Sequence, residues 1–281
     1  MLTVILPAYN EELRIAETIT KYGNYLAESN IWGRDNGKWC NILVVDDGST
    51  DKTLDVVKQC NIRVEGIEIS AVSLEQNEGK GSAVARGMMA VEEMRQDAEN
   101  ASGWVILVAD ADGSGDMVYL NAMIYEFSKL VERTAERNTS NITPWRTKAM
   151  LVGNRDNASL SRIITRWGFK TLVKIICGDL QVDDTQCGFK LMTLDAGLML
   201  YSNLNLKRWT HDVEVLYRAK KMMVPVTELK IGWEDKAGSK LATTVGETVR
   251  MSAIMLFETL TLTYHYKIGQ WKLPDAERDI M

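Results

Sequence analysis

Two carboxylates, Asp110 and Asp112, stand at the end of a run of five apolar residues, 105–109, and are followed by Gly113. Such a run predicts a strand that is buried on both faces. Residues i and i+2 of an extended chain point the same way, so both carboxylates leave one face at the carboxyl end of the strand. Open α/β sheets bind ligands at that edge. Two hard oxygen donors this close suit Mg²⁺, whose shell is often completed by substrate phosphates. A solvated acidic turn is the alternative for an isolated Asp-x-Asp.

Polar clusters also follow other predicted strands, at residues 7–12, 46–51 and 76–82. The carboxyl ends of parallel strands share one edge of a sheet, so we expect these clusters to lie beside the two carboxylates. Gly79-Lys80-Gly81 at a helix start could hold phosphate through backbone N–H groups and one ammonium group. The chain has no Walker A loop and no G-x-G-x-x-G after its first strand, which disfavours P-loop and dehydrogenase-type folds.

Composition narrows the class of protein. The chain has 281 residues and a formal net charge of −5, which gives no electrostatic footprint for nucleic acid. Its four cysteines form no C-x-x-C pair, so zinc and a disulfide scaffold are disfavoured and a reducing compartment is expected. Two histidines, His211 and His265, argue against a His-based triad. No apolar run of about 18 residues and no charged leader occur, so neither a transmembrane helix nor a signal peptide is expected.

Strands and helices alternate along the chain, which predicts an α/β protein with a mostly parallel sheet. The predicted strands are 2–6, 42–45, 67–74, 105–109, 150–152 and 226–233. The predicted helices are one ending near Glu28 and capped by Asn10, then 52–59 capped by Ser49 or Thr50, 83–98, 117–136, 159–177, one opened by the segment 208–214 and ending near Met223, and 244–266.

The predicted helix 159–177 is basic and amphipathic. Four cations recur at four-residue spacing and share one face, at Arg162, Arg166, Lys170 and Lys174. Apolar residues that include Trp167 form the rest of its surface. This pattern is typical of a helix that lies in a membrane interface. A helix that packs on the core with its basic face in water is the alternative, and the sequence leaves both open.

Taken together, the clusters at 7–12, 46–51, 77–81 and 110–112 resemble those of family 2 glycosyltransferases with the GT-A fold. The segments 153–155, 184–190, 208–214 and 238–240 are similar to motifs of the eukaryotic dolichyl-phosphate β-glucosyltransferases. The resemblance spans residues 2–273. It departs from the usual pattern at Asn154 and at Thr210-His211, and the N-terminal membrane anchor usual in those enzymes is not in this sequence.

The resemblance implies one GT-A domain over residues 1–281, with a nucleotide-binding half at 1–115, an acceptor half at 116–240 containing the interface helix 159–177, and a C-terminal helix and tail at 241–281. It implies an inverting enzyme that moves glucose from UDP-glucose to dolichyl phosphate, at the cytosolic face of the endoplasmic reticulum membrane, and no nucleic-acid partner.

The resemblance also implies roles for single residues. Uridine and ribose would be held by Pro7, Tyr9, Glu11, Asp46 and Asp47. Mg²⁺ or Mn²⁺ would be carried by Asp110 and Asp112, with Asp112 also counted as catalytic. Asp184 and Asp212 would orient the sugar hydroxyls or the nucleophile. The phosphate of the lipid acceptor would be gripped by Arg155, Arg162 and Arg166, because a guanidinium fork suits phosphate. Lys80 is counted among the residues that bind the ligand.

Three rival functions remain. A dolichyl-phosphate mannosyltransferase would use GDP-mannose, and no residue distinguishes uracil from guanine. Processive polysaccharide synthases carry Gln-x-x-Arg-Trp, whereas Ile163 and Asn205 stand at the Gln position of the two Arg-Trp pairs here. A non-catalytic nucleotide-sugar-binding protein is disfavoured by the intact Asp110 and Asp112.

Overall fold

A computed structural model describes residues 1–29, 40–60, 66–96, 103–137, 144–156, 160–233 and 245–274, except for the side chains of 156, 160–167 and 245–249. Within these ranges the chain forms one seven-stranded sheet in the order β3-β2-β1-β4-β6-β5-β7. The strands are β1 Leu2–Ala8, β2 Cys40–Asp46, β3 Ile67–Ser73, β4 Val105–Val108, β5 Met150–Asp156, β6 Lys190–Thr193 and β7 Val226–Gly232. Only β6 runs antiparallel to its described neighbours, so the predicted mostly parallel sheet is confirmed.

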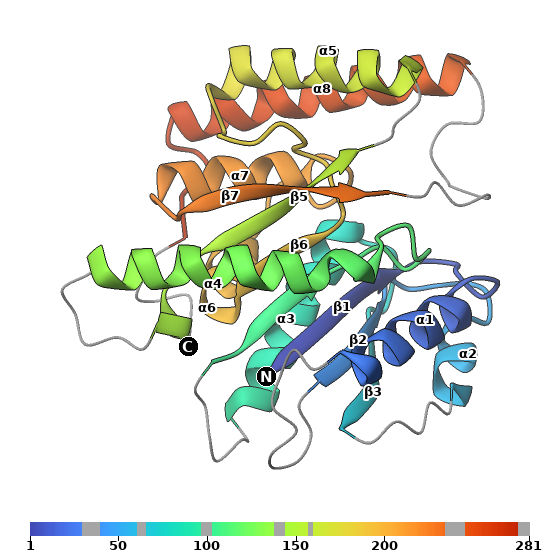
Figure 1. Ribbon diagram of the computed structural model, residues 1–281. Coiled ribbons are helices and arrows are strands. Elements are labelled where there is room, and N and C mark those ends of the chain that lie inside the picture. The colour runs from blue at the N-terminus through green and yellow to red at the C-terminus, as the bar shows by residue number, and fades with distance from the viewer. Residues whose placement is uncertain are drawn as a thin grey trace.

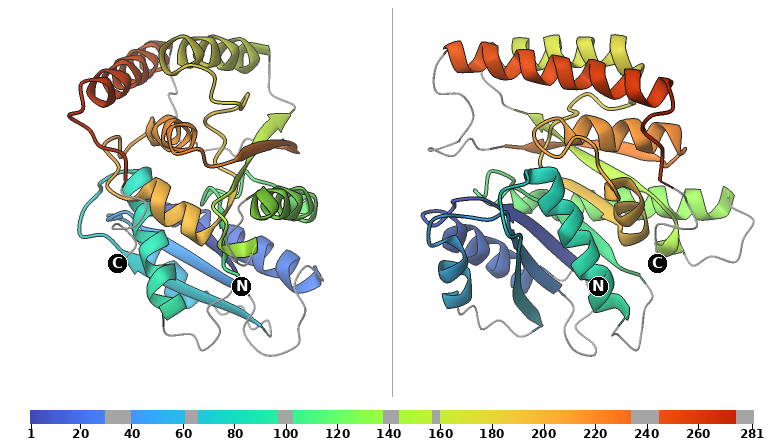
Figure 2. Two further views of the ribbon diagram at one scale, coloured as in Figure 1. Left: turned by 90° about the vertical axis from the view of Figure 1, so that its left-hand side faces the viewer. Right: turned by 180° about the vertical axis from the view of Figure 1, so that it is seen from behind.

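Helices cover both faces of the sheet (Figure 1). α1 and α4 lie on one face and α3 and α6 on the other, while α5 and α8 form an outer layer at one end of the molecule (Figure 2). The helices are α1 Ile15–Glu28, α2 Thr53–Gln59, α3 Lys80–Gln96, α4 Leu120–Arg137, α5 Leu160–Cys177, α6 Leu194–Tyr201, α7 His211–Lys221 and α8 Val245–Lys267, with short 3₁₀ turns η1 Met117–Tyr119 and η2 Pro144–Arg146. No helix in the described ranges is long and apolar enough to cross a bilayer.

The apolar content of the first four strands places the core. All side chains of β2 and β4 are buried, and β1 is buried except at Pro7. The parallel register aligns Ala8 with Asp46, and the backbone N–H of Asp47 donates to the Ala8 carbonyl at 2.8 Å. The ends of β1, β2 and β4 are therefore held side by side, as the polar clusters predicted.

The caps predicted for α1 and α2 were wrong. The Asn10 side chain accepts from the backbone N–H groups of Thr50 at 2.8 Å and Asp51 at 3.3 Å, so it ties two loops together, and α1 begins only at Ile15. Ser49 Oγ accepts from the N–H of Asn10 at 2.9 Å instead of capping α2. Each of these polar side chains accepts hydrogen bonds from the backbone of a neighbouring loop. Such tertiary contacts cannot be predicted from local sequence spacing.

β6 and α6 were not predicted. They follow one another without a turn, because Thr193 ends β6 and its side chain also caps α6 by accepting from the N–H of Ala196 at 3.3 Å. The sequence of this segment is therefore one mostly apolar run, whose apolar residues follow neither the two-residue period of a strand nor the 3.6-residue period of a helix.

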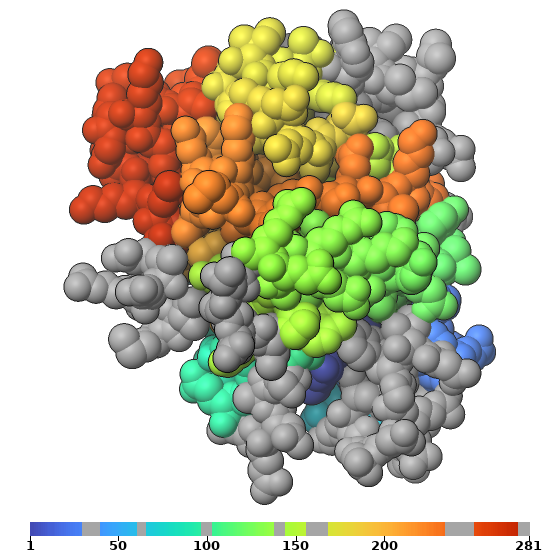
Figure 3. Space-filling view, turned by 60° about the vertical axis from the view of Figure 1, so that its left-hand side comes forward, coloured from blue at the N-terminus to red at the C-terminus, as the bar shows by residue number. Residues whose placement is uncertain are grey.

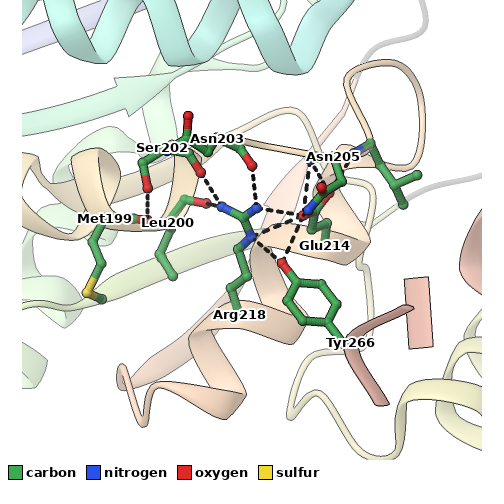
Figure 4. Close-up of polar contacts among 9 residues, drawn as sticks. Met199, Leu200, Ser202, Asn203, Asn205, Glu214, Arg218 and Tyr266 are labelled. Carbon is green, nitrogen blue, oxygen red and sulfur yellow. Dashed lines mark hydrogen bonds and ion pairs between the residues drawn. The ribbon is translucent and has the colours of Figure 1, made fainter. Parts of the chain in front are cut away.

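A buried ion pair joins α7 to the C-terminal end of α8 (Figure 4). Arg218 Nη2 lies 2.7 Å from Glu214 Oε1, and both side chains are almost completely buried. The Tyr266 hydroxyl on α8 lies 2.8 Å from Arg218 Nε and 3.0 Å from Glu214 Oε1. Carbonyl groups of Leu200, in the last turn of α6, and of Ser202 and Asn203, just after this helix, accept the remaining guanidinium protons. With its charges paired and its protons bonded, this network ties α7 to α8 and to the end of α6.

Candidate active site

A cavity of about 340 Å³ opens at the carboxyl ends of β1, β2 and β4. The start of α3 and the segment before α7 complete its wall. It is lined by Pro7, Ala8, Tyr9, Glu11, Arg14, Asp47, Asn77, Gly79, Lys80, Ala83, Asp110, Ala111, Asp112, Arg208 and Trp209. Seven of the sequence-predicted site residues therefore meet in one place, namely Pro7, Tyr9, Glu11, Asp47, Lys80, Asp110 and Asp112.

Asp110 is engaged by the protein itself. Its Oδ1 forms an ion pair with the Lys80 ammonium group, and the backbone of Gly188 packs so closely that a Cβ there would collide with the carboxylate. Burial raises the pKa of Asp110, but the positive charges of Lys80 and Lys190 outweigh it and hold this pKa below its usual value. The pKa of Lys80 is in turn raised, because Asp110 and Asp212 outweigh the opposite effect of burial. Asp110 thus serves as the fixed counter-ion of Lys80.

Asp112 has looser contacts than Asp110, although the two side chains are similarly exposed, at 21% and 26%. One oxygen, Oδ1, accepts from the N–H of Ser114 at 3.0 Å and from its hydroxyl at 2.7 Å. The other, Oδ2, has only Arg14 Nη1 as a cationic neighbour among the described residues, at 3.9 Å. Gly113 permits this turn, since its φ is +72° and its Cα lies against Thr18. Both carboxylates line the cavity, but Asp110 is tightly paired with Lys80, whereas the cationic partner of Asp112 Oδ2 is 3.9 Å away.

The two acids at the end of β2, Asp46 and Asp47, are both buried but differ in their contacts. Asp47 lines the cavity and accepts from the N–H groups of Glu78 and Gly79, both at 2.9 Å. Burial raises the pKa of Asp47 in spite of these bonds. Asp46 lies behind it, buried, with Ser49 N–H at 3.3 Å from Oδ2. Asp47 therefore joins β2 to the Gly79-Lys80-Gly81 turn, whereas Asp46 supports the loop from inside.

The segment before α7 packs on that turn. The Lys207 carbonyl accepts from the N–H of Gly81 at 2.8 Å, and a Cβ at Gly79 would collide with the same carbonyl. Gly79 also has a φ of +113°, which favours glycine. This close approach carries Arg208 and Trp209 into the wall of the cavity. Arg208 Nη1 donates to Asn77 Oδ1 at 3.3 Å.

Asp212 and Asp184 lie outside the lining of the cavity, and both are buried. Lys190 Nζ donates to Asp212 Oδ1 at 2.7 Å, and His211 Nε2 lies 2.9 Å from the same oxygen. Burial raises the pKa of Asp212, but His211 and Lys190 together hold it well below its usual range. Asp184 accepts from Arg155 Nε at 2.6 Å and from Nη2 at 2.8 Å, a bidentate ion pair.

Arg155 is therefore paired with Asp184, and its guanidinium also lies over the Trp233 ring, 5.3 Å from the ring centre. Arg162 and Arg166 belong to α5, and their side chains lie outside the described part of the chain. The predicted grip of these arginines on a lipid phosphate stays a prediction.

Four charged, polar or aromatic side chains of the cavity wall were not predicted, namely those of Arg14, Asn77, Arg208 and Trp209. Three of them lie within motifs that were recognised, but nothing in the spacing showed which side chain faces the ligand. Arg14 follows Glu11 by three residues, and its Nε donates to Glu11 Oε2 at 2.7 Å. That spacing of opposite charges was the available signal.

The donor set fits a divalent cation that is shared with a ligand. No group of three or more His, Cys, Asp or Glu side chains suited to a metal occurs in the described part of the chain. Asp112 Oδ2 is nevertheless a hard oxygen donor facing the cavity, and Asp110 is two residues away. Mg²⁺ and similar ions take one or two carboxylates and complete the shell with phosphate oxygens and water. The site suits such an ion when an anionic ligand is present.

Comparison with known proteins agrees with this architecture. Residues 3–131 match the model of the family described as Glycosyl transferase family 2. The chain is 30% identical over 272 residues to a dolichyl-phosphate beta-glucosyltransferase of Dictyostelium discoideum, covering 97% of this chain and 76% of that protein. It is 31% identical over 286 residues to a dolichyl-phosphate beta-glucosyltransferase of Mus musculus, covering 99% of this chain and 79% of that protein.

The fold has solved counterparts. One is glucosyl-3-phosphoglycerate synthase from Mycobacterium tuberculosis in complex with Mn²⁺ and uridine-diphosphate-glucose, with a TM-score of 0.54 and 15% identity, covering 93% of this chain and 79% of that chain. This likeness confirms the predicted GT-A fold. The chain belongs to glycosyl transferase family 2 and, within it, to the dolichyl-phosphate beta-glucosyltransferases, and it is a glycosyltransferase.

Proposed function

We propose that this enzyme transfers glucose from UDP-glucose to dolichyl phosphate and yields dolichyl β-D-glucosyl phosphate, a donor for N-glycan precursor assembly. The observation that carries the proposal is the presence of Asp112, whose Oδ2 is only loosely paired, with the cations Arg14, Lys80 and Arg208 in the lining of one cavity. Such a cavity suits a diphosphate and its divalent cation. Two further facts support it: the name of the relatives, and the Mn²⁺ and UDP-glucose in the solved counterpart.

In this proposal Pro7, Tyr9, Glu11 and Asp47 contact the uridine from the ends of β1 and β2, while Asp46 holds their loop. Asp112 holds Mg²⁺ or Mn²⁺, which supplies Lewis-acid stabilisation of the negative charge left on the UDP oxygens. Lys80 is kept charged and oriented by Asp110 and adds one ammonium group beside the diphosphate.

The nucleophile is an oxygen of dolichyl phosphate. It attacks the anomeric carbon as the bond to the UDP oxygen breaks, in a single in-line displacement that turns an α-linked donor into a β-linked product. A phosphate monoester has a second pKa near 6 and is mostly dianionic at pH 7, so no strong general base is needed. Asp184 and Asp212 are proposed to orient the acceptor side of the site through their partners Arg155 and Lys190.

Donor choice is the first test. We expect isothermal titration in Mn²⁺ or Mg²⁺ to show tighter binding of UDP and UDP-glucose than of GDP and GDP-mannose. We also expect EDTA to weaken the binding of UDP, because Asp112 needs the cation to approach a diphosphate. Tighter binding of GDP would favour mannosyl transfer and contradict the proposed donor.

Such an acceptor is a membrane lipid, so we propose that the enzyme works at the cytosolic face of the endoplasmic reticulum membrane. α8 offers the apolar surface for contact. Four large side chains of α8 and one directly after it lie three or four residues apart and are between 37% and 70% exposed, at Ile254, Phe257, Leu260, Tyr264 and Ile268. Glu258 is the one acid among the described side chains of α8, and it bonds to Thr210 at the start of α7. An exposed apolar stripe of this kind is typical of a helix that lies in a membrane interface.

α5 packs beside α8 in this outer layer (Figure 3). The basic stripe on α5 is partly neutralised, because Lys170 pairs with Asp183, and Lys174 lies 3.2 Å from Asp179. These acids come from the loop after the helix. We propose that the α5–α8 layer meets the membrane chiefly through the apolar stripe of α8.

Co-sedimentation with vesicles that contain anionic lipid tests the contact. We expect the double substitution Phe257→Ser and Tyr264→Ser to reduce vesicle binding severalfold, because it removes most of the exposed aromatic surface of the stripe. Lys170→Gln with Lys174→Gln should have a smaller effect, since both lysines are already paired. Val118→Ser with Tyr125→Ser is the matched control, because these side chains are 60% and 61% exposed and lie on η1 and α4. Equal losses in the stripe and control variants would contradict the proposal.

A further inference from the structure

Arg14 has an unusual position between two acids. Its Nη2 lies 2.5 Å from Glu11 Oε2, and its Nε donates to the same oxygen. Its Nη1 is buried, makes no hydrogen bond to any described residue, and lies 3.9 Å from Asp112 Oδ2. The guanidinium group is therefore anchored on one side, and Nη1 is a buried, unsatisfied donor of a residue that lines the cavity.

Two other ion pairs at or near the cavity are tightly matched. Lys80 is paired with Asp110 and, outside the lining, Lys190 with Asp212. Arg208, a further cation of the wall, donates to the Asn77 side chain. Arg14 and Asp112 remain as a loose pair, because 3.9 Å is too long for a hydrogen bond. A ligand that supplies both a cation for Asp112 and an acceptor for Arg14 Nη1 would satisfy both groups at once.

We propose that Arg14 makes divalent-cation binding at Asp112 depend on the diphosphate of the donor. Without a nucleotide, a cation on Asp112 Oδ2 lies close to a guanidinium group that Glu11 holds in place, and the two like charges repel. A bound diphosphate reverses this. Its oxygens accept from Arg14 Nη1, bind the cation and offset the repulsion.

The coupling is reciprocal by thermodynamic necessity, so nucleotide binding depends on the cation to the same degree. The enzyme would then load the cation together with the donor and would not hold it in the empty site. Arg14 is a positioning residue in this scheme. The inference rests on the proposed function only in requiring a diphosphate ligand, and it does not depend on uracil or on glucose.

Direct measurement of Mn²⁺ binding tests the inference without any turnover. Electron paramagnetic resonance of free Mn²⁺ gives the affinity of wild type, Arg14→Met and Arg14→Lys, each alone, with UDP and with inorganic pyrophosphate. We expect Arg14→Met to bind Mn²⁺ alone about tenfold more tightly than wild type, about 1.4 kcal/mol. The gain in affinity caused by UDP or pyrophosphate should shrink by a similar factor. Arg14→Lys keeps the charge and should stay near wild type.

Arg86→Met is the matched control, because Arg86 pairs with Glu93 at 3.1 Å on α3 and lies outside the lining of the cavity. Thermal unfolding confirms that each variant is folded. The inference would be overturned if Arg14→Met had the same Mn²⁺ affinity as wild type and the same increase in that affinity with UDP or pyrophosphate. It would also be overturned if neither ligand changed the Mn²⁺ affinity of the wild type. Pyrophosphate and GDP could both raise the Mn²⁺ affinity through Arg14, with GDP having a larger effect than UDP. That result would support the role of Arg14 and contradict the proposed UDP-glucose donor.

Discussion

Asp112→Asn is expected to lower glucosyl transfer at least about 100-fold, since a catalytic cation stabilises the leaving group by several kcal/mol and each 1.36 kcal/mol is a factor of ten. The variant should stay folded, because an amide oxygen can still accept the two bonds from Ser114 that fix this turn. The loss should appear in single-turnover measurements and in a weaker affinity for Mn²⁺ in the presence of UDP.

Two comparisons sharpen this result. Asp116→Asn changes a nearby carboxylate that caps η1 and lies outside the lining of the cavity, so its transfer rate should stay near that of wild type. Asp110→Asn should affect Mn²⁺ affinity less than Asp112→Asn does, because Asp110 is held by Lys80 and Gly188. Transfer by Asp112→Asn within tenfold of wild type would reject Asp112 as the metal ligand.

The position of the site could be predicted from the sequence because it follows from backbone rules. A strand that is apolar on both faces ends where polar residues begin, and parallel strands bring those ends to one edge. Asp47, Lys80 and Asp112 therefore meet as expected. This alignment depends on the positions of whole strands, so it predicts where the site lies without predicting which side chains face the ligand.

The division of labour within the site could not be predicted. Asp110 and Asp112 are equivalent in an extended chain, yet only Asp110 meets Lys80 and the bare backbone of Gly188. Both partners are far away in the sequence. The same holds for Asp212, whose partner Lys190 begins the unpredicted strand β6. Ion pairs between distant segments are set by tertiary packing, and no local spacing encodes them.

The charge of α5 is a second feature that the sequence could not predict correctly. Its cations share one face with no acid on the helix, which suggested an uncompensated basic stripe. In the structure Asp179 and Asp183, from the loop that follows, lie beside Lys174 and Lys170. The apolar stripe of α8 went unnoticed because the helix has apolar residues on every side, and only packing shows which of them stay exposed.

Transfer of labelled sugar to dolichyl phosphate tests the central claim most directly. Purified wild type would be incubated with dolichyl phosphate in detergent and with labelled UDP-glucose or GDP-mannose, in Mn²⁺, Mg²⁺ or EDTA, and the lipid phase would be extracted and counted. We predict a glucolipid only when UDP-glucose, dolichyl phosphate and a divalent cation are all present, and a β linkage in that product by NMR. Transfer of mannose in preference to glucose, an α-linked product, or undiminished transfer in EDTA would contradict the account.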